Sequence, residues 1–121
     1  MQKRKLGKTG IEVPVFGFGG YRIDKRVRSH AEALRKALVS GINFIDTSTN
    51  YSDGNSELLI GEVLKDMEES SDSKRANFVI SSKAGYIQGK NLDNLKRREA
   101  KGTPYPEIIN CSPDLKHCIH P

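Results

Sequence analysis

The sequence alternates short apolar segments with amphipathic ones, and this order restricts the possible folds more than any other feature. Strands are expected at 15–20, 42–45 and 77–82, and helices at 29–41 and 56–68. Such an order favours right-handed crossover units, in which parallel strands form a sheet that helices cover. We therefore expect an α/β fold built on a parallel sheet.

The segment 29–41 carries the clearest helix signals. Ser29 and Glu32 match a capping box at its start, and Gly41 suits the left-handed position after its last turn. Its apolar face consists of Ala31, Leu34, Ala37 and Leu38. In the second helix, the residues expected to point inward are Leu59, Ile60, Val63, Leu64 and Met67.

Three segments lie outside this alternation. Residues 3–14 contain two short extended pieces around Gly7-Lys8-Thr9-Gly10, which is typical of a hairpin turn, and 69–74 is predicted to be a loop. From about residue 84 the periodicity fades into a stretch rich in Gly, Pro, Asn and charge. We expect no regular structure there until a further helix begins within 117–121.

The composition of the 121-residue chain is that of an ordinary globular protein with room for one domain. Its longest apolar runs fall far short of the roughly 20 residues that cross a bilayer, and its start lacks the pattern of a secretory signal. The two cysteines, Cys111 and Cys118, are too few for a disulfide framework. We therefore expect a cytoplasmic protein without membrane contact.

The net charge of +5 is concentrated in 3–5, 24–28 and 95–98. Nucleic-acid binders usually combine such clusters with stacking aromatic residues or a groove-reading helix, and neither is evident in the sequence. We expect that these clusters are solvated or contact a small phosphate ligand, and we predict no nucleic-acid partner.

Polar residues at the ends of the predicted strands form the candidate site. Asp46 ends the second strand, Lys83 ends the third, and Tyr51 follows in the turn after Asp46. The carboxyl ends of parallel strands open on one face, where an ammonium stabilises a phenolate and a carboxylate holds the ammonium. The residues fit an acid–base relay, but each also fits a turn, a cap or a solvated lysine.

Three stretches, GFGGYR, GINFIDTSTNYSDGNSELLIGEVLK and VISSKAGY, resemble the N-terminal part of the aldo-keto reductase family in order and spacing. The resemblance extends from about Arg4 to Pro121. It implies the N-terminal part of a (β/α)8 TIM barrel preceded by a β-hairpin, with three of the eight strands present. Residues 1–121 would then be a partial NADP-dependent oxidoreductase domain, truncated before the fourth strand.

The resemblance also implies the residues that carry the chemistry. The catalytic residues would be Asp46, Tyr51 and Lys83, with Tyr51 protonating a carbonyl oxygen as hydride arrives from NADP(H). The cofactor-binding residues would be Gly20, Tyr21, Arg22 and Asp46. Tyr86 would edge the pocket of a small carbonyl or alcohol substrate, and no metal is implied.

In the resembling family a catalytic histidine follows the next strand, which would lie beyond Pro121. The histidines present, His30, His117 and His120, occupy other positions. A barrel of eight units takes about 250 residues. We therefore expect residues 1–121 to be an N-terminal fragment that oxidises no NADPH by itself.

Other interpretations remain open. A Rossmann dehydrogenase would need a third glycine where Arg22 stands. A small metal-binding module could use four ligands, although their spacing is unusual for zinc: Cys111, His117, Cys118 and His120. A non-catalytic binding or regulatory relative of the family would retain the same motifs.

Overall fold

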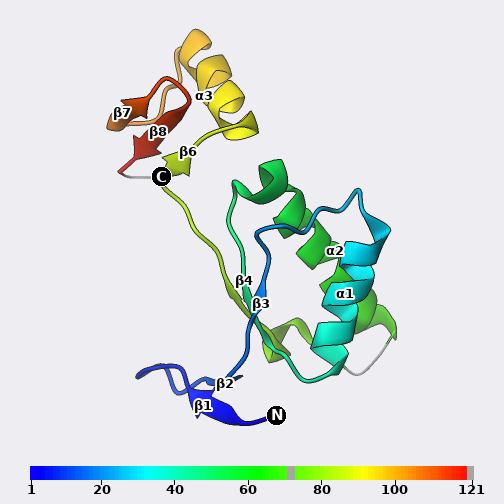
Figure 1. Ribbon diagram of the computed structural model, residues 1–121. Coiled ribbons are helices and arrows are strands. Elements are labelled where there is room, and N and C mark those ends of the chain that lie inside the picture. The colour runs from blue at the N-terminus through cyan, green and yellow to red at the C-terminus, as the bar shows by residue number, and fades with distance from the viewer. Residues whose placement is uncertain (71–72, 120–121) are drawn as a thin grey trace. The chain divides into compact units, whose positions relative to one another are not determined.

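The computed structural model describes residues 1–70 and 73–119, and the chain divides into two compact units. We call Met1–Ser82 unit 1 and Lys83–Pro121 unit 2, and describe each by itself (Figure 1). Two residues of the loop predicted at 69–74 lie outside the described residues.

Unit 1 begins with the predicted hairpin. β1 (Lys3–Lys5) pairs antiparallel with β2 (Glu12–Pro14). In the turn, the Thr9 hydroxyl donates to the carbonyl of Leu6 at 2.6 Å, and Gly7 and Gly10 adopt positive φ angles of 55° and 76°. Glycine suits both positions because left-handed backbone is strained for other residues.

A three-stranded parallel sheet follows, as the alternation predicted. Its order is β3 (Phe18–Gly19), β4 (Phe44–Asp46) and β5 (Val79–Ser81). The register places Gly19 beside Asp46 and Asp46 beside Ser81, so the three strands end at the same level. The strands are shorter than the apolar segments that predicted them.

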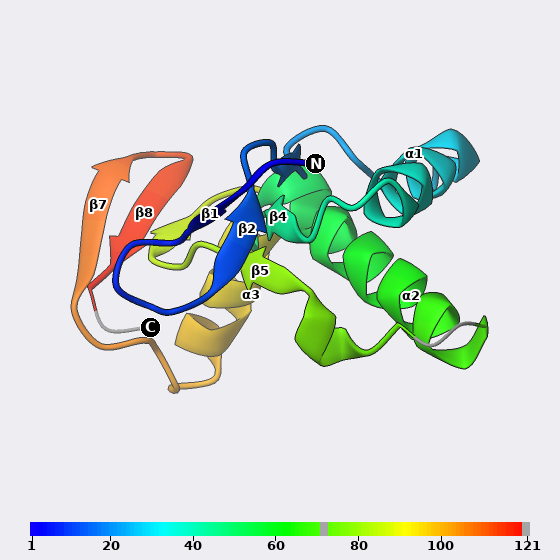
Figure 2. The same cartoon turned by 90° about the horizontal axis from the view of Figure 1, so that it is seen from below.

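Helices α1 (Arg28–Val39) and α2 (Asn55–Ser70) pack against one face of this sheet (Figures 1 and 2). All five α2 residues that were predicted to point inward are buried. Burial of such an apolar stripe is the main source of stability for a helix of this length. The core of unit 1 consists of Ile23, Leu34, Leu38, Ile45, Leu59, Ile60, Val63, Leu64, Met67 and Phe78.

The start of α1 differs from the prediction. The helix begins at Arg28 after Val27, and no side chain caps it, so the predicted capping box is wrong. Ser29 already lies inside the helix, where its hydroxyl cannot take the capping position. Glu32 instead pairs with the guanidinium of Arg28 at 2.9 Å. The prediction for Gly41 is confirmed, since its φ is 95°.

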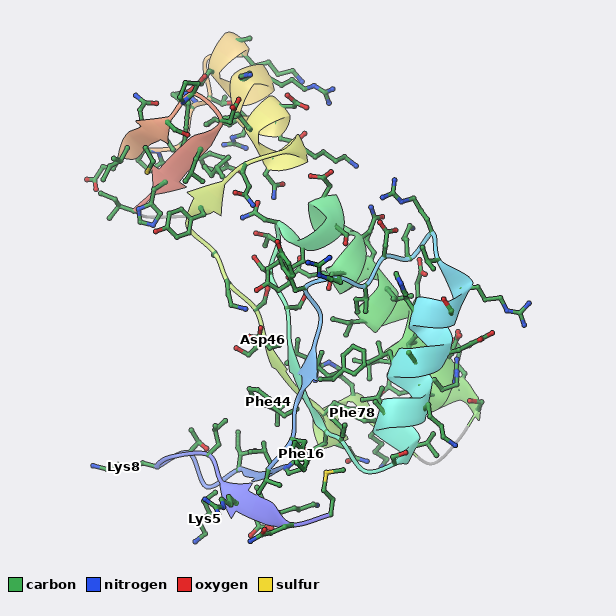
Figure 3. The ribbon with its side chains drawn as sticks, viewed as in Figure 1. Lys5, Lys8, Phe16, Phe44, Asp46 and Phe78 are labelled. Atoms are coloured by element: carbon green, nitrogen blue, oxygen red, sulfur yellow. The ribbon has the colours of Figure 1, made fainter. Side chains whose placement is uncertain are left out.

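The sheet of unit 1 has two different faces. Ile45 and Phe78 belong to the core beneath the helices, whereas Phe44 and Asp46 lie on the side that faces away from α1 and α2 (Figure 3). This arrangement follows from the alternation of side chains along a strand. Asp46 is therefore directed away from the helix-covered core.

The expectation that residues from about 84 onward lack regular structure is wrong, because unit 2 is folded. It contains β6 (Tyr86–Ile87), α3 (Lys90–Ala100), β7 (Ile108–Ser112) and β8 (Leu115–Cys118). The strands form an antiparallel sheet in the order β6-β8-β7. The helix predicted to begin within 117–121 is also wrong, because β8 extends to Cys118.

The core of unit 2 is small. Ile87, Leu92, Leu95 and Cys118 are buried together, with Tyr105 and Ile108 packed against them. Opposed residues of an antiparallel sheet share a face, so Tyr86, His117 and Ile109 form one row across the three strands. Tyr86 and Ile109 are exposed, so this row lies on the outer face of the sheet. The opposite face packs with α3 and forms the core.

Across residues 1–70 and 73–119, the strands form three separate sheets and no closed barrel. Of the helices in this described part, none has the length and apolar character that crossing a bilayer requires.

Candidate active site

The candidate site is built on the aligned ends of the parallel strands. Pairing continues one residue past the strands, because the Gly20 amide donates to the Asp46 carbonyl and the Thr47 amide to the Ser81 carbonyl, each at 2.7 Å. The Asp46 carbonyl and the Thr47 amide belong to one peptide unit, so these bonds hold the backbone just after Asp46 to both neighbouring strands. The loops that follow the strands at this edge therefore begin from a fixed backbone.

Two buried hydroxyl groups hold the edge together. The Ser56 hydroxyl, fully buried at the start of α2, donates to the Gly20 carbonyl at 2.8 Å and lies 2.8 Å from the Thr47 hydroxyl. A serine hydroxyl has one proton, so Thr47 must be the donor to Ser56. This network links the ends of β3 and β4 with α2.

Gly20 is required by this network. A Cβ atom at this position would lie 2.8 Å from the Ser56 hydroxyl oxygen and 2.9 Å from the Asp46 carbonyl oxygen. From the sequence, Gly20 was predicted to bind the cofactor, and the roles of Thr47 and Ser56 were not predicted. The only available signal was a serine and a threonine flanking the turn that contains Tyr51.

Tyr51 opens a short turn, Tyr51–Gly54, between β4 and α2. Its amide donates to the Ser48 carbonyl at 3.1 Å, and its side chain is half-buried. The Tyr51 ring meets the Tyr21 ring edge to face, with centroids 5.0 Å apart and planes at 83°. The structure thus brings together two predicted site residues, Tyr21 and Tyr51.

The loop between β3 and α1 carries Tyr21 and Arg22. Tyr21 is 64% exposed, and the guanidinium carbon of Arg22 lies 5.7 Å from the centroid of its ring. This distance is within the range of a cation–π contact. An exposed ring and an exposed guanidinium therefore lie next to the Gly20 end of the strand edge.

Asp24 anchors this loop. Its carboxylate accepts bonds from the Arg26 side chain, at 2.9 and 2.5 Å, and from the Arg26 amide at 2.9 Å. These bonds lower the pKa of Asp24 from 3.8 to about 2, and the same pairing raises the pKa of Arg26. The Asp24 amide also donates to Nδ1 of His30 at 3.0 Å, which links the loop to the first turn of α1.

Asp46 and Lys83 belong to different units. Asp46 is half-buried at the end of β4, whereas Lys83 is exposed and is the first residue of unit 2. Ser82, just before Lys83, donates its hydroxyl to the Glu57 carboxylate at 2.6 Å, so the end of β5 is tied to α2. The grouping of Lys83 with Asp46 and Tyr51 stays a prediction.

The proposed ligands of a metal-binding module do not come together within the described residues. Cys111 is exposed on β7, whereas Cys118 is buried in the core of unit 2. Residues 1–70 and 73–119 contain no group of three or more His, Cys, Asp and Glu side chains that could hold a metal ion. His120 lies outside the described residues.

Tyr86, predicted to edge a substrate pocket, lies on β6. It is 59% exposed and its ring lies against the ring of His117, with centroids 4.9 Å apart and planes at 36°. Gly85 permits this pairing, because a Cβ atom there would lie 2.9 Å from Nε2 of His117. The role of Tyr86 toward a substrate stays a prediction.

A helix-covered parallel sheet with polar residues at the carboxyl ends of its strands defines a class of α/β proteins whose sites lie at that edge. Within this class, the sequence model of the Aldo/keto reductase family matches residues 16–104, which is more than half of the chain. The chain belongs to the aldo-keto reductase family, which confirms the resemblance noted in the sequence.

Individual relatives support this assignment. The chain is 33% identical over 123 residues to a putative voltage-gated potassium channel subunit beta of Schizosaccharomyces pombe, covering 88% of this chain and 35% of that protein. It is 30% identical over 120 residues to an NADH-specific methylglyoxal reductase of Escherichia coli, covering 90% and 35%. The chain spans about a third of the length of these relatives.

A solved structure of the family shares the fold of this chain over part of its length. An aldo-keto reductase from Bacillus halodurans, in its holo form, matches with a TM-score of 0.62 and 26% sequence identity. This match covers 74% of the chain and 28% of that protein. The expected α/β fold is therefore confirmed at the level of the family.

Proposed function

We propose that this chain is the N-terminal portion of an NADP(H)-dependent aldo-keto reductase that reduces an aldehyde or ketone to an alcohol. Three strands of its (β/α)8 barrel would be the parallel strands of unit 1, and the chain would end before the fourth. The observation that carries this proposal is the placement of Tyr51 in a chain that belongs to the family. Tyr51 is half-buried, its ring contacts that of Tyr21, and it opens the turn that follows Asp46.

Tyr51 would be the proton donor. Its hydroxyl gives a proton to the carbonyl oxygen while the carbonyl carbon accepts hydride, so the products are an alcohol and a phenolate. The Lys83 ammonium would stabilise that phenolate, and the Asp46 carboxylate would orient the lysine. The anchoring of Asp46 by backbone bonds to Gly20 and of β5 by Ser82 and Glu57 suits such a role.

A reduced nicotinamide cofactor would supply the hydride. The exposed Tyr21 ring and Arg22 guanidinium fit this group, since a ring can stack on a planar base or nicotinamide and a guanidinium binds phosphate. Gly20 would contribute by keeping the start of the loop close to Asp46. Asp46 would reach the nicotinamide ribose through its carboxylate.

The proposal is tested in two stages. Purified 1–121 is expected to oxidise no NADPH in the presence of a panel of aldehydes, and turnover that disappears in Tyr51→Phe would contradict the fragment assignment. Sequencing downstream of Pro121 is expected to show that the reading frame continues through the remaining barrel units. A stop codon directly after Pro121 would also contradict that assignment.

A second candidate is a non-catalytic subunit of a larger assembly. The relative named as a putative potassium channel subunit beta favours it. Such a subunit needs the family fold but not proton donation by Tyr51. In the continued chain, Tyr51→Phe would leave its binding function intact, whereas the reductase proposal predicts a loss of hydride transfer.

A further inference from the structure

Two serine hydroxyls connect the β3–α1 loop with the segment that carries Tyr51. Ser56 donates to the Gly20 carbonyl and Ser52 donates to the Ile23 carbonyl, both at 2.8 Å. Tyr21 lies between these two acceptors in the chain, and Tyr51 directly precedes Ser52. The edge-to-face contact of the two tyrosine rings therefore lies on a loop and a turn that are bonded at two points.

Ser52 makes its bond from an unfavourable backbone conformation. Its φ is 50°, that of Asp53 is 54° and that of Gly54 is 88°, so three successive residues are left-handed. Side chains other than glycine are strained in this region, and such strain persists only where surrounding contacts maintain it. A glycine at position 52 would fit the backbone with less strain, but it could not donate to Ile23.

The acceptor of the Ser52 bond is itself held in place. Ile23 is 6% exposed in the core of unit 1, and the next residue, Asp24, is fixed by Arg26 and His30. A hydrogen bond to a rigid acceptor restricts its donor more than one to a mobile loop. The Ser52 bond therefore restricts the motion of the adjacent Tyr51 backbone relative to the anchored loop.

We propose that Ser52 is a positioning residue for Tyr51. Its hydroxyl holds the Tyr51 turn against the β3–α1 loop, so that the Tyr51 ring stays in contact with Tyr21 and its hydroxyl stays in one place. The benefit for catalysis rests on the proposed function, whereas the ring placement does not. A proton donor requires such placement because small displacements from a reacting atom reduce rates strongly.

The test measures ring contact by nuclear Overhauser effects between the selectively labelled rings of Tyr21 and Tyr51 in the full 121-residue chain. Ser52→Gly is expected to reduce the cross-peak at least threefold while the methyl shifts of Leu59 and Val63 stay as in the wild type. Ser52→Ala loses the bond and keeps the strain, so it should melt at a lower temperature than Ser52→Gly.

Ser40→Ala is the matched control, because Ser40 also donates from its side chain to a backbone carbonyl at 2.8 Å, but at the exposed end of α1. It is expected to leave the cross-peak unchanged. A folded Ser52→Gly variant that keeps the full cross-peak would overturn the proposal. Failure of both Ser52 variants to fold would overturn it as well, since the bond would then serve the fold and not ring placement.

The same measurement separates this proposal from the proposed reaction. Loss of the cross-peak in Ser52→Gly supports the positioning role even if the continued protein shows no reductase activity. Conversely, an active reductase whose Tyr51 is essential would not rescue the positioning role if Ser52→Gly kept the ring contact.

Discussion

Unit 1 and unit 2 differ in how their strands are covered. Within the described residues, two helices of unit 1 pack on a parallel sheet over a core of ten buried residues, whereas unit 2 has one helix, an antiparallel sheet and four buried core residues. The larger core imposes regular apolar spacing on the sequence, and the smaller one does not. Two of the three residues predicted for catalysis, Asp46 and Tyr51, therefore lie in the unit whose fold the sequence specifies better, whereas Lys83 is the first residue of the other unit.

The largest expected effect separates the two cores. Leu34 and Leu95 are both fully buried, in unit 1 and unit 2 respectively. We expect Leu34→Ala to lower the free energy of unfolding by roughly 4 kcal/mol and Leu95→Ala by roughly 2 kcal/mol, because a small core collapses more easily around a cavity. Chemical denaturation followed by NMR signals from each unit measures both values.

Hydrogen exchange sharpens this test. Leu95→Ala is expected to speed exchange in α3 and β8 while amides of α2 keep their protection. The exposed Val39→Ala is the control and should change neither unit. Equal loss of protection in both units after Leu95→Ala would show that they unfold together.

Glycine substitutions give the next largest effect. Gly20→Ala would place a Cβ atom against the Asp46 carbonyl oxygen, which cannot move without breaking the strand edge. We expect it to destabilise unit 1 by about 2 kcal/mol. Gly19→Ala meets nothing within 4 Å and is the matched control, expected to stay within about 0.5 kcal/mol of wild type.

Gly85 is the corresponding position in unit 2. Its φ is 109° and a Cβ atom would meet the side chain of His117, which can rotate away. We expect Gly85→Ala to destabilise unit 2 by about 1 kcal/mol through backbone strain. A larger effect here than at Gly20 would contradict the view that backbone contacts fix the edge of unit 1 more tightly.

The pH dependence of unit 1 should depend on Asp24. Its folded pKa of about 2 lies below the ordinary value of 3.8, so its stabilising contribution is complete above that ordinary value and disappears as the pH falls toward 2. We expect Asp24→Asn to be less stable than wild type at neutral pH, with the difference shrinking as acid is added. Thermal melts at several pH values measure this, and a constant difference would contradict it.

The smallest effect is expected at Ser29. A capping box would make Ser29→Ala destabilising by about 1 kcal/mol. The structure has no such cap, and alanine is the better helix former inside α1, so we expect no loss of stability. If denaturation shows that Ser29→Ala loses about 1 kcal/mol, as a true cap would, Ser29 caps α1 and the helix does not begin at Arg28.

The sequence predicted the arrangement of unit 1 because its apolar positions follow helical and strand periods over long segments. Leu59, Ile60 and Val63 are examples, since each is buried as its spacing predicted. In unit 2, β6 has two residues and one face of the sheet is exposed, so periodicity carried too little signal. The predicted capping box is wrong because the helix already begins at Arg28, so Ser29 lies inside the helix and not at its cap.

The candidate site was predictable only in part. The edge position of Asp46 follows from the end of an apolar strand. The contact of Tyr21 with Tyr51 and the hydroxyl network of Ser56 depend on side-chain distances that linear spacing does not reveal. Tyr21 was assigned to the cofactor, and the structure adds its contact with the proposed proton donor.

The proposed function requires that Tyr51 donates the proton in a reductase of which this chain is the N-terminal part. The most direct measurement is single-turnover hydride transfer from NADPH to an aldehyde by the continued protein, comparing wild type with Tyr51→Phe. The claim predicts a loss of about 10²- to 10⁴-fold with cofactor binding unchanged, as for removal of a general acid. Hydride transfer at the wild-type rate in Tyr51→Phe would contradict it.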